Sequence, residues 1–237
     1  MQSPTRVTLV SPHQDDAVFS LGCWIVRWSK SNVAVTVVNC FTRSTHSPFI
    51  ACKEGLDVPL MRAQEDERSL RSLHPSISIV NLALWDAPIR IGCDIADVCD
   101  PAKTQGWDGE IVETIGAALP SASLTLFPLA FGSHIDHRHV HDVSFSRHVS
   151  EVGYYEDLPY AARASPGCQR ACLEKVASTW QSSYVFELES DSIAEKETAA
   201  ALYRSQIDAH GLSEIVDYTR ALGGERIWLP STSHDSY

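Results

Sequence analysis

The strongest constraint on the fold is an alternation of short β-branched segments with segments of helical periodicity. The first apolar run covers residues 7–12 and ends abruptly in polar residues. Residues 17–28 then carry apolar side chains at helical spacing, and residues 33–41 form a second apolar run. Apolar runs of this length predict buried strands. A strand, helix, strand order favours a parallel sheet with helices packed on it.

The same alternation continues along the chain. Helices are predicted over 59–73, 107–119, 137–149 and 193–210, and strands over 77–84, 124–130, 153–156 and 183–188. Segments 42–58 and 85–106 are predicted to be long loops. The predicted class is α/β and Rossmann-like, with a mostly parallel sheet flanked by helices. No repeat or linker divides the sequence, so residues 1–237 are expected to form one domain, with 231–237 as a loose tail.

The composition limits the partners that the chain can have. Its formal net charge is −11, whereas nucleic acid and anionic membranes attract clustered Lys and Arg. The sequence shows no signal-peptide pattern and no apolar run that approaches a membrane span. The seven cysteines form no C-x-x-C pair, which favours reduced thiols. A cytoplasmic location and a small-molecule partner are expected, and homo-oligomer formation stays open.

A first group of chemically active side chains lies in Ser11-Pro-His-Gln-Asp-Asp-Ala17, after the first predicted strand. His13 and Asp16 are three residues apart, so a helix that began here would place both on one face as a metal-ligand pair. Asp15 would be rotated away and could face a water on the metal. The alternative is that an aspartate caps the helix while His13 packs in the core.

A second motif, Phe131-Gly-Ser-His-Ile-Asp-His-Arg-His-Val-His-Asp142, also follows a predicted strand and holds four of the ten histidines. A catalytic zinc site uses three protein ligands and an open position for water. His13, Asp16 and one histidine of this motif would complete such a set. Zinc lowers the pKa of bound water to roughly 7, and Asp15 would accept the proton as the water attacks a carbonyl. The two motifs together predict a zinc-dependent hydrolase.

The two motifs resemble those of the LmbE-like or PIG-L-type deacetylases. That family includes N-acetylglucosaminyl-phosphatidylinositol deacetylase and the deacetylases of the mycothiol and bacillithiol pathways. Its P-H-x-D-D motif is matched by Pro12-His-Gln-Asp-Asp16, and its H-x-D-H motif by His134-Ile-Asp-His137. Further likeness runs through Arg62–Glu65, Tyr154–Tyr160 and Lys196–Gln206, so it covers most of the chain.

The resemblance implies roles for particular residues. The implied zinc ligands are His13, Asp16 and His137, and the implied general base is Asp15. His134 would stabilise the tetrahedral intermediate or protonate the leaving amine, and Asp136 would orient His134.

Some features depart from the family pattern. Ala17 stands where a glutamate often follows the aspartate pair, and His139 and His141 are additional to the pattern. His141 lies four residues after His137, so on a helix it could compete as a ligand. A position at the surface, or in contact with a ligand and not with the metal, is favoured. Histidine and carboxylate ligands also accept other divalent ions, such as Fe²⁺, in place of zinc.

Side chains after the predicted strands are candidates for binding the substrate, because active-site loops converge at the carboxyl ends of parallel strands. The candidates are Arg43, Arg62, Arg68, Trp85, Asp86, Arg90, Tyr155 and Glu156. The alternatives are a solvated helix face for Arg62 and Arg68, and a pair between Asp86 and Arg90.

The sequence therefore predicts hydrolysis of an N-acyl group, expected to be N-acetyl, from an amino sugar or an amino-sugar conjugate. An amidase that acts on a thiol conjugate or on an antibiotic-type glycan is the related alternative. A nucleotide-binding or regulatory α/β module would need a glycine-rich turn after the first strand, which this chain lacks. A structural zinc site normally has four protein ligands, often cysteines, and has no use for Asp15 and His134 beside the metal.

Overall fold

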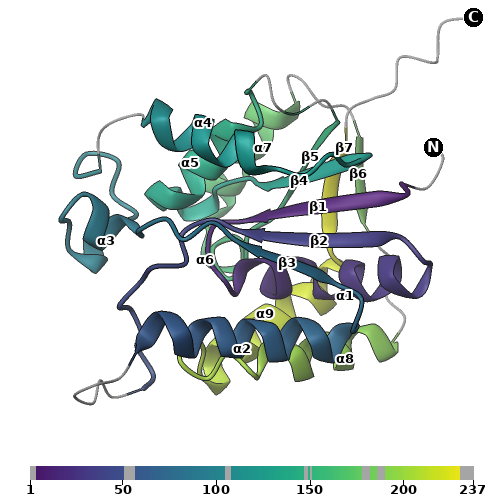
Figure 1. The fold of residues 1–237 in the computed structure, drawn as a ribbon. Helices are drawn as coiled ribbons and strands as arrows, with labels where there is room; N and C mark the ends of the chain where they lie inside the picture. Colours follow the sequence, from purple (N-terminus) through teal and green to yellow (C-terminus); the bar gives the residue numbers. More distant parts are fainter. Residues whose placement is uncertain are drawn as a thin grey trace, which may run out of the picture.

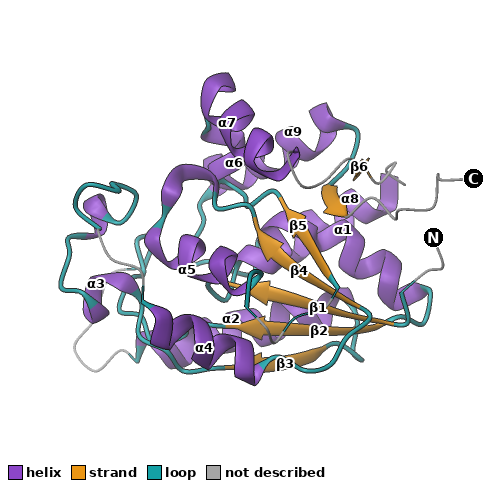
Figure 2. Ribbon diagram, turned by 90° about the horizontal axis from the view of Figure 1, so that it is seen from above, coloured by secondary structure: helices purple, strands orange, loops and turns teal. Residues whose placement is uncertain are grey.

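A seven-stranded sheet in the order β3-β2-β1-β4-β5-β7-β6 runs through the middle of the protein (Figures 1 and 2). The computed structural model describes residues 4–50, 57–104, 108–146, 149, 151–177, 182–185 and 190–229. The strands are β1 (Arg6–Ser11), β2 (Ala34–Asn39), β3 (Ser78–Asn81), β4 (Leu124–Pro128), β5 (Val152–Tyr155), β6 (Ser182–Val185) and β7 (Arg226–Leu229). β1 to β5 pair in parallel, whereas β7 is antiparallel to both β5 and β6.

Helices cover both faces of this sheet. Figure 1 shows α1 (Asp16–Lys30), α2 (Val58–Leu73), α8 (Ser190–Ala200) and α9 (Ala209–Leu222) below it, and α4 (Gly109–Ala118) and α5 (Ile135–Val143) above it. The remaining helices are α3 (Ala87–Arg90), η1 (Ile95–Asp97), η2 (Phe131–Ser133), α6 (Tyr160–Arg163) and α7 (Pro166–Ala177). In the part of the chain that the structure describes, no helix has the length and apolar character needed to cross a membrane.

The helix α1 is held firmly because it is packed on two sides. A Cβ on Gly22 would lie 2.7 Å from Lys196 Cγ of α8, so only glycine allows this close approach. Lys196 is fully buried, pairs with Glu225 at 2.8 Å and donates to Thr219 Oγ1 at 2.9 Å. Glu225 in turn accepts hydrogen bonds from the backbone of Cys23. This buried network fixes α1 and therefore the turn that precedes it.

The predicted α/β class, with a mostly parallel sheet flanked by helices, is confirmed. Most predicted elements are present with shifted ends; the helix predicted over 137–149, for example, is α5, which already ends at Val143. The loop predicted over 85–106 contains the short helices α3 and η1. α7, α9 and β7 were not predicted. Residues 186–189 of the predicted strand 183–188, and the tail 231–237, lie outside the described residues.

The single helix predicted over 193–210 is wrong. α8 ends at Ala200, a turn follows, and α9 begins at Ala209. The turn is stabilised by contacts with α2, because Tyr203 donates to Asp66 and Ser205 donates to Glu65 through its hydroxyl and its backbone N–H. These contacts with distant residues override the local helical pattern.

Candidate active site

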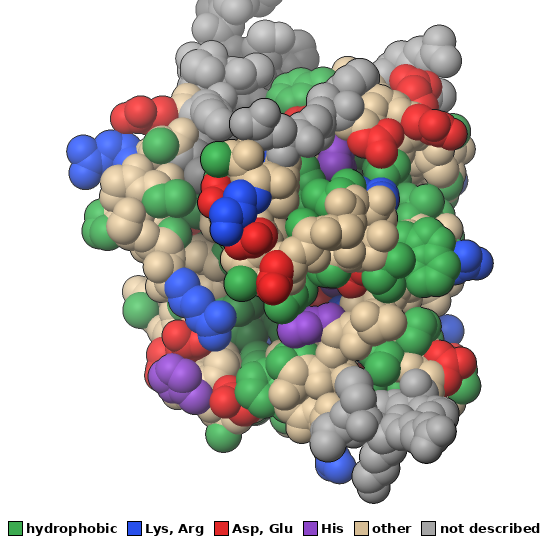
Figure 3. Space-filling model, turned by 90° about the vertical axis from the view of Figure 1, so that its left-hand side faces the viewer, with side chains coloured by type: hydrophobic (Ala, Val, Ile, Leu, Met, Phe, Trp, Pro, Cys, Tyr) green, Lys and Arg blue, Asp and Glu red, His purple; other side chains and the backbone are tan. Residues whose placement is uncertain are grey.

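The two histidine motifs meet at the carboxyl ends of β1 and β4. These strands pair in parallel, so the turn after Ser11 and the segment after Pro128 emerge at the same edge of the sheet. Figure 3 shows this end of the molecule, where histidine atoms border a recess between hydrophobic and acidic side chains. The structure thus brings together residues that lie more than a hundred positions apart.

His13 and Asp16 form a pair, although not on one helix face as the spacing suggested. α1 begins only at Asp16, so His13 lies in the preceding turn. The Asp16 carboxylate oxygen Oδ2 accepts the backbone N–H of His13 at 2.8 Å and lies 3.4 Å from His13 Nδ1. The other ring nitrogen, Nε2, donates to Asp136 Oδ2 at 3.1 Å. Nδ1 therefore faces the Asp16 carboxylate.

His137 approaches the same oxygen from α5. Its Nε2 lies 3.4 Å from Asp16 Oδ2, and its Nδ1 donates to Asp157 Oδ2 at 2.8 Å. The side chain is fully buried, and its Nε2 has no hydrogen-bond partner. A buried nitrogen lone pair without a donor costs free energy unless a cation or donor meets it.

This trio fits a tetrahedral metal ion. Two ligands at about 2.0–2.2 Å from such an ion lie about 3.3–3.6 Å apart. Asp16 Oδ2 is 3.4 Å from each imidazole nitrogen, and the ligand atoms of His13, Asp16 and His137 lie within 4.8 Å of one another. Each histidine donates its other ring N–H to a buried carboxylate, which is the usual arrangement for metal-binding histidines. The geometry of this trio is therefore compatible with a bound divalent cation.

A second group, His13, His134 and Asp136, also brings three ligand atoms within 4.8 Å. Its carboxylate is already occupied, because Asp136 accepts hydrogen bonds from Arg90 at 2.6 Å, from Ala87 N at 3.0 Å and from His13. The Asp136 side chain contacts His13, whereas the contact between Asp136 and His134 runs through the Asp136 backbone N–H.

The electrostatics of the cluster favour positive charge. Burial lowers the pKa of His13, but hydrogen bonds to Asp136 and Asp16 outweigh it and raise that pKa to about 10. Burial raises the pKa of Asp16, but the nearby His137 and the hydrogen bond with His13 outweigh it and lower it to about 2. Since the Asp16 carboxylate, which stabilises the proton on His13, is also a candidate metal ligand, the cluster suits a cation.

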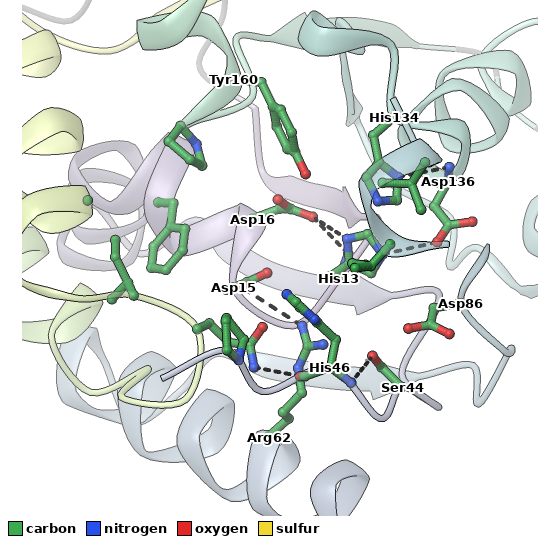
Figure 4. Close-up of a pocket in the computed structure, with 18 of the residues that line it drawn as sticks. His13, Asp15, Asp16, Ser44, His46, Arg62, Asp86, His134, Asp136 and Tyr160 are labelled. Carbon is green, nitrogen blue, oxygen red and sulfur yellow. Dashed lines mark hydrogen bonds and ion pairs between the residues drawn. The ribbon is translucent and has the colours of Figure 1, made fainter. Parts of the chain in front are cut away.

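Asp15 lies in the cavity beside the cluster and makes no side-chain hydrogen bond to the start of α1. Burial and the adjacent Asp16 raise its pKa, whereas Arg62, whose guanidinium is 3.7 Å away, lowers it. A carboxylate whose pKa is raised is a stronger base than an exposed one. Figure 4 shows Asp15 and Arg62 facing each other across the floor of the cavity.

His134 is the N-cap of α5, and its Nδ1 accepts the backbone N–H of Asp136 at 3.2 Å. Burial and the neighbouring His13 and His137 hold the pKa of His134 well below its usual range. The neutral ring therefore carries its proton on Nε2, and His134 lines the cavity as a hydrogen-bond donor.

Tyr160 lies against the edge of His137, with ring centroids 5.0 Å apart. Figure 4 shows its hydroxyl pointing into the cavity on the side of Asp16. Gly132 has φ +75°, and a Cβ there would lie 2.7 Å from Tyr160 Cδ1. Only glycine therefore fits this turn and leaves room for the ring.

These side chains lie around a cavity of about 380 Å³. Its inner part is formed by His13, Asp15, Asp16, His134 and Asp136, and His137 lies buried behind this lining. The rest of the lining comes from Phe19, Arg62 and four further segments, which contribute Ser44, His46, Pro48, Phe49, Asp86, Pro88, Ile95, Val98, Cys99, Pro159, Tyr160, Arg163, Gln206, Ile207, Asp208 and Gly211. The volume lies at the lower end of the range for small-molecule pockets, about 300–1,000 Å³.

Comparison with known proteins identifies the family. Residues 8–147, more than half of the chain, match the family model described as PIG-L: GlcNAc-PI de-N-acetylase. The chain belongs to the PIG-L family. The matched range includes His13, Asp15, Asp16, His134 and His137, whereas the outer wall from Pro159 to Gly211 lies beyond it.

One curated relative in this family is 2′-N-acetylparomamine deacetylase from Streptomyces fradiae. It is 29% identical over 236 residues, which cover 96% of this chain and 82% of that protein. The deacetylase–bog complex of the teicoplanin biosynthesis pathway shares the fold, with a TM-score of 0.73 at 22% identity, covering 98% of this chain and 100% of that one. The zinc inhibited form of teicoplanin deacetylase gives a TM-score of 0.71 at 21% identity, with coverage of 98% and 100%.

The structure brings two of the eight predicted substrate-binding residues of this PIG-L protein, Arg62 and Asp86, to the cavity. Arg90 instead pairs with Asp136, and no ion pair joins Arg90 to Asp86 among the described residues. Arg43 lies over the Trp85 ring at 5.2 Å, and both residues lie outside the cavity lining.

The three other candidates also lie outside the lining. Arg68 is exposed on α2. The Tyr155 hydroxyl donates to the backbone oxygen of Val10 in the core, and Glu156 pairs with Arg226 at 2.8 Å. These contacts leave the side chains of Tyr155 and Glu156 with structural partners away from the cavity.

The two additional histidines are not part of the cluster. His141 shares an edge of α5 with His137, but its Nδ1 donates to the backbone oxygen of Pro128, and its ring stacks on Tyr154. His139 Nε2 accepts the backbone N–H of Asp108.

Sequence reasoning missed several residues of this site. Asp157, which supports His137, was not predicted, and neither were His46 and Tyr160. The only signals were indirect, because His46 lies in the predicted loop 42–58 and Tyr160 ends the family-like segment Tyr154–Tyr160.

Proposed function

We propose that this protein is a metal-dependent deacetylase that releases acetate from an N-acetylated amino sugar or amino-sugar conjugate. The observation that carries the proposal is the convergence of three ligand atoms, from His13, Asp16 and His137, beside a buried aspartate that is not one of them. Membership of the PIG-L family and the deacetylase activity of the Streptomyces fradiae relative support the same reaction.

His13, Asp16 and His137 would hold the metal, for which we propose zinc. When bound, zinc would lower the pKa of a water ligand and polarise the carbonyl of the amide. Asp157 and Asp136 hold the two imidazoles so that their lone pairs point at one place. The two carboxylates therefore orient the imidazole rings before any metal binds.

Asp15 would act as general base. It would accept a proton from the attacking water while the water oxygen bonds to the carbonyl carbon. The C–N bond then breaks, and the leaving nitrogen takes up a proton, which gives acetate and an amine. Burial raises the pKa of Asp15, which strengthens it as a base and prepares it to return the proton to the amine.

His134 would stabilise the negative charge that develops on the carbonyl oxygen. Its Nδ1 is occupied by the Asp136 backbone N–H, so the Nε2–H is available to the cavity. A donor fixed in this way strengthens its hydrogen bond as charge builds up. The Tyr160 hydroxyl, on another side of the cavity, is positioned to be a second donor (Figure 4).

Amine release from N-acetylated amino sugars tests this proposal. The protein is stripped of metal and assayed at several zinc concentrations with N-acetylglucosamine and 2′-N-acetylparomamine. The zinc range includes low values, because a zinc inhibited form of a structurally similar deacetylase is known. We expect release of acetate and amine that depends on added metal. Tight metal binding without turnover of either compound, or of N-acetylated thiol conjugates, would contradict the proposal.

A further inference from the structure

Aspartates stand at the N-cap of six helices in the described part of the chain, and two of them do not cap. Four accept a backbone N–H of the first turn, as expected for this position: Asp57, Asp94, Asp108 and Asp208. Asp15 and Asp86 make no such bond, and both line the cavity. Asp15 is accounted for by the proposed reaction, whereas Asp86 is not.

Asp86 is buried without a partner for its charge. Its side chain is 4% exposed, and Oδ1 has no hydrogen-bond partner. Among the described residues, no basic side chain forms an ion pair with it. Figure 4 places Asp86 on the same side of the cavity as Ser44 and His46. A buried carboxylate costs several kcal/mol unless a donor or cation satisfies it, so a partner from outside the chain is expected.

The position of Asp86 relative to the metal-ligand cluster is fixed. The backbone N–H of Asp86 donates to Arg43 O at 3.1 Å, and that of Ala87 donates to Asp136 Oδ2 at 3.0 Å. Asp136 Oδ2 also holds the ring of His13. The backbone that carries the Asp86 side chain is therefore held at a fixed place beside the cluster at which the amide of a substrate would lie.

The basic groups of the cavity are already used. Arg62 is paired with Asp15, and Arg163 with Glu214. Burial and Arg62 lower the pKa of His46 and outweigh the opposite effect of Asp15 and Asp86, so this imidazole is neutral near pH 7. Among the described lining residues, the Asp86 carboxylate thus has no cation to balance it.

We infer that Asp86 binds a free ammonium group of the substrate, so the preferred substrates carry a second, unacetylated amine beside the amide that is cleaved. This inference rests on the proposed function and narrows it from amino sugars in general to polyamino saccharides. An ammonium supplies both the positive charge and the N–H donors that a buried carboxylate needs. The net charge of −11 would also attract cationic substrates over longer distances.

Three substrates separate this ammonium contact from a contact with a hydroxyl. They are 2′-N-acetylparomamine, its fully N-acetylated neutral form, and N-acetylglucosamine. For the wild type we expect kcat/KM to be highest for the cationic compound. Asp86→Asn keeps an acceptor for a hydroxyl but removes the charge. It should lower kcat/KM for 2′-N-acetylparomamine by at least about tenfold more than it lowers kcat/KM for the two neutral substrates.

Asp94→Asn is the matched control, since it removes one negative charge from an exposed helix cap outside the cavity lining. It should leave all three values unchanged. Equal losses for cationic and neutral substrates in Asp86→Asn would show that Asp86 binds a hydroxyl or supports the site, and would overturn the inference. No loss for any substrate would overturn it as well.

Binding measurements distinguish this inference from the proposed function. Calorimetry with 2′-N-acetylparomamine is carried out on zinc-loaded Asp15→Asn and on Asp15→Asn combined with Asp86→Asn. A Kd that is at least about tenfold weaker in the double variant supports the ammonium contact even if the wild type cleaves no amide. Equal Kd values, or no binding to Asp15→Asn, would reject it.

Discussion

The two walls of the cavity differ in how their polar groups are satisfied. On the wall formed by the ends of β1 and β4, His13 and His137 each donate to a buried carboxylate, so both rings are fixed. The second wall is the part of the lining that contains Arg62 and Asp86. Here Asp86 Oδ1 and Arg62 Nε are buried without a hydrogen-bond partner. In the proposed function the first wall would hold the metal ion, and in the further inference the second would contact the substrate.

This difference separates chemistry from recognition. A reaction needs groups held within a fraction of an ångström, and second carboxylates behind the ligands achieve this before substrate arrives. Unsatisfied buried groups cost about 1–3 kcal/mol each, and such a cost is usually tolerated where function needs it. Arg62 and Asp86 lie within the matched range 8–147, whereas the lining residues from Pro159 to Gly211 lie beyond it.

The largest effect is expected from Asp15, which lies between the two walls. Asp15→Asn removes the proposed base but keeps its size, so kcat should fall by about 10²–10⁴-fold. Metal content, measured by elemental analysis, should stay that of the wild type, because Asp15 is not one of the ligands. His13→Ala, in contrast, should lose both metal and turnover. Full activity of Asp15→Asn would remove the base from the mechanism.

A smaller effect is expected from weakening the first wall at Asp157. Its two oxygens accept from His137 Nδ1 and from the backbone N–H of Phe131. Asn at this position keeps only one acceptor, so His137 should be held less firmly and metal affinity should fall about 10–100-fold. Competition with a chromogenic chelator measures this affinity.

Asp217→Asn is the control for that experiment, because Asp217 forms an exposed pair with Arg220 on α9. Its metal affinity should equal that of the wild type. If Asp157→Asn also binds metal as tightly as the wild type, the two walls do not differ in the way that the hydrogen bonds suggest.

The candidate metal ligands could be predicted from the sequence, whereas the residue that accepts a hydrogen bond from His137 could not. His13, Asp16 and His137 lie in short motifs at strand ends, where local sequence determines their placement. Asp157 follows β5, and its contact with His137 depends on how β5 packs beside β4, which no local pattern reveals. At the same strand end the sequence suggested Glu156, one residue earlier, whose side chain pairs with Arg226 instead.

The same limit explains the errors in the fold. The turn after α8 depends on donors from Tyr203 and Ser205 to carboxylates on α2, more than a hundred residues earlier. Asp86 was a candidate because of its position after a strand. The sequence alone suggested Arg90 as a partner for Asp86, but in the fold Arg90 pairs with Asp136.

The last prediction concerns stability, not activity, and rests on Asp66, one turn after Arg62. Asp66 accepts from Tyr203 and Asn39, and burial raises its pKa from 3.8 to about 7. Between about pH 4 and 7 the folded state therefore binds more protons than the unfolded state at this group. Its contribution to the free energy of unfolding is full below pH 4 and is lost as the pH rises toward 7, with a slope of at most about 1.4 kcal/mol per pH unit.

Asp66→Asn removes this titration but can still accept from Asn39. Urea unfolding from pH 4.5 to 7.5 should therefore show the free energy of unfolding of the wild type decreasing relative to that of Asp66→Asn as the pH rises. Metal binding affects both proteins alike and cancels in the difference. Parallel curves would mean that Asp66 titrates normally, so that it carries a charge at neutral pH and Arg62 has a second anionic neighbour besides Asp15.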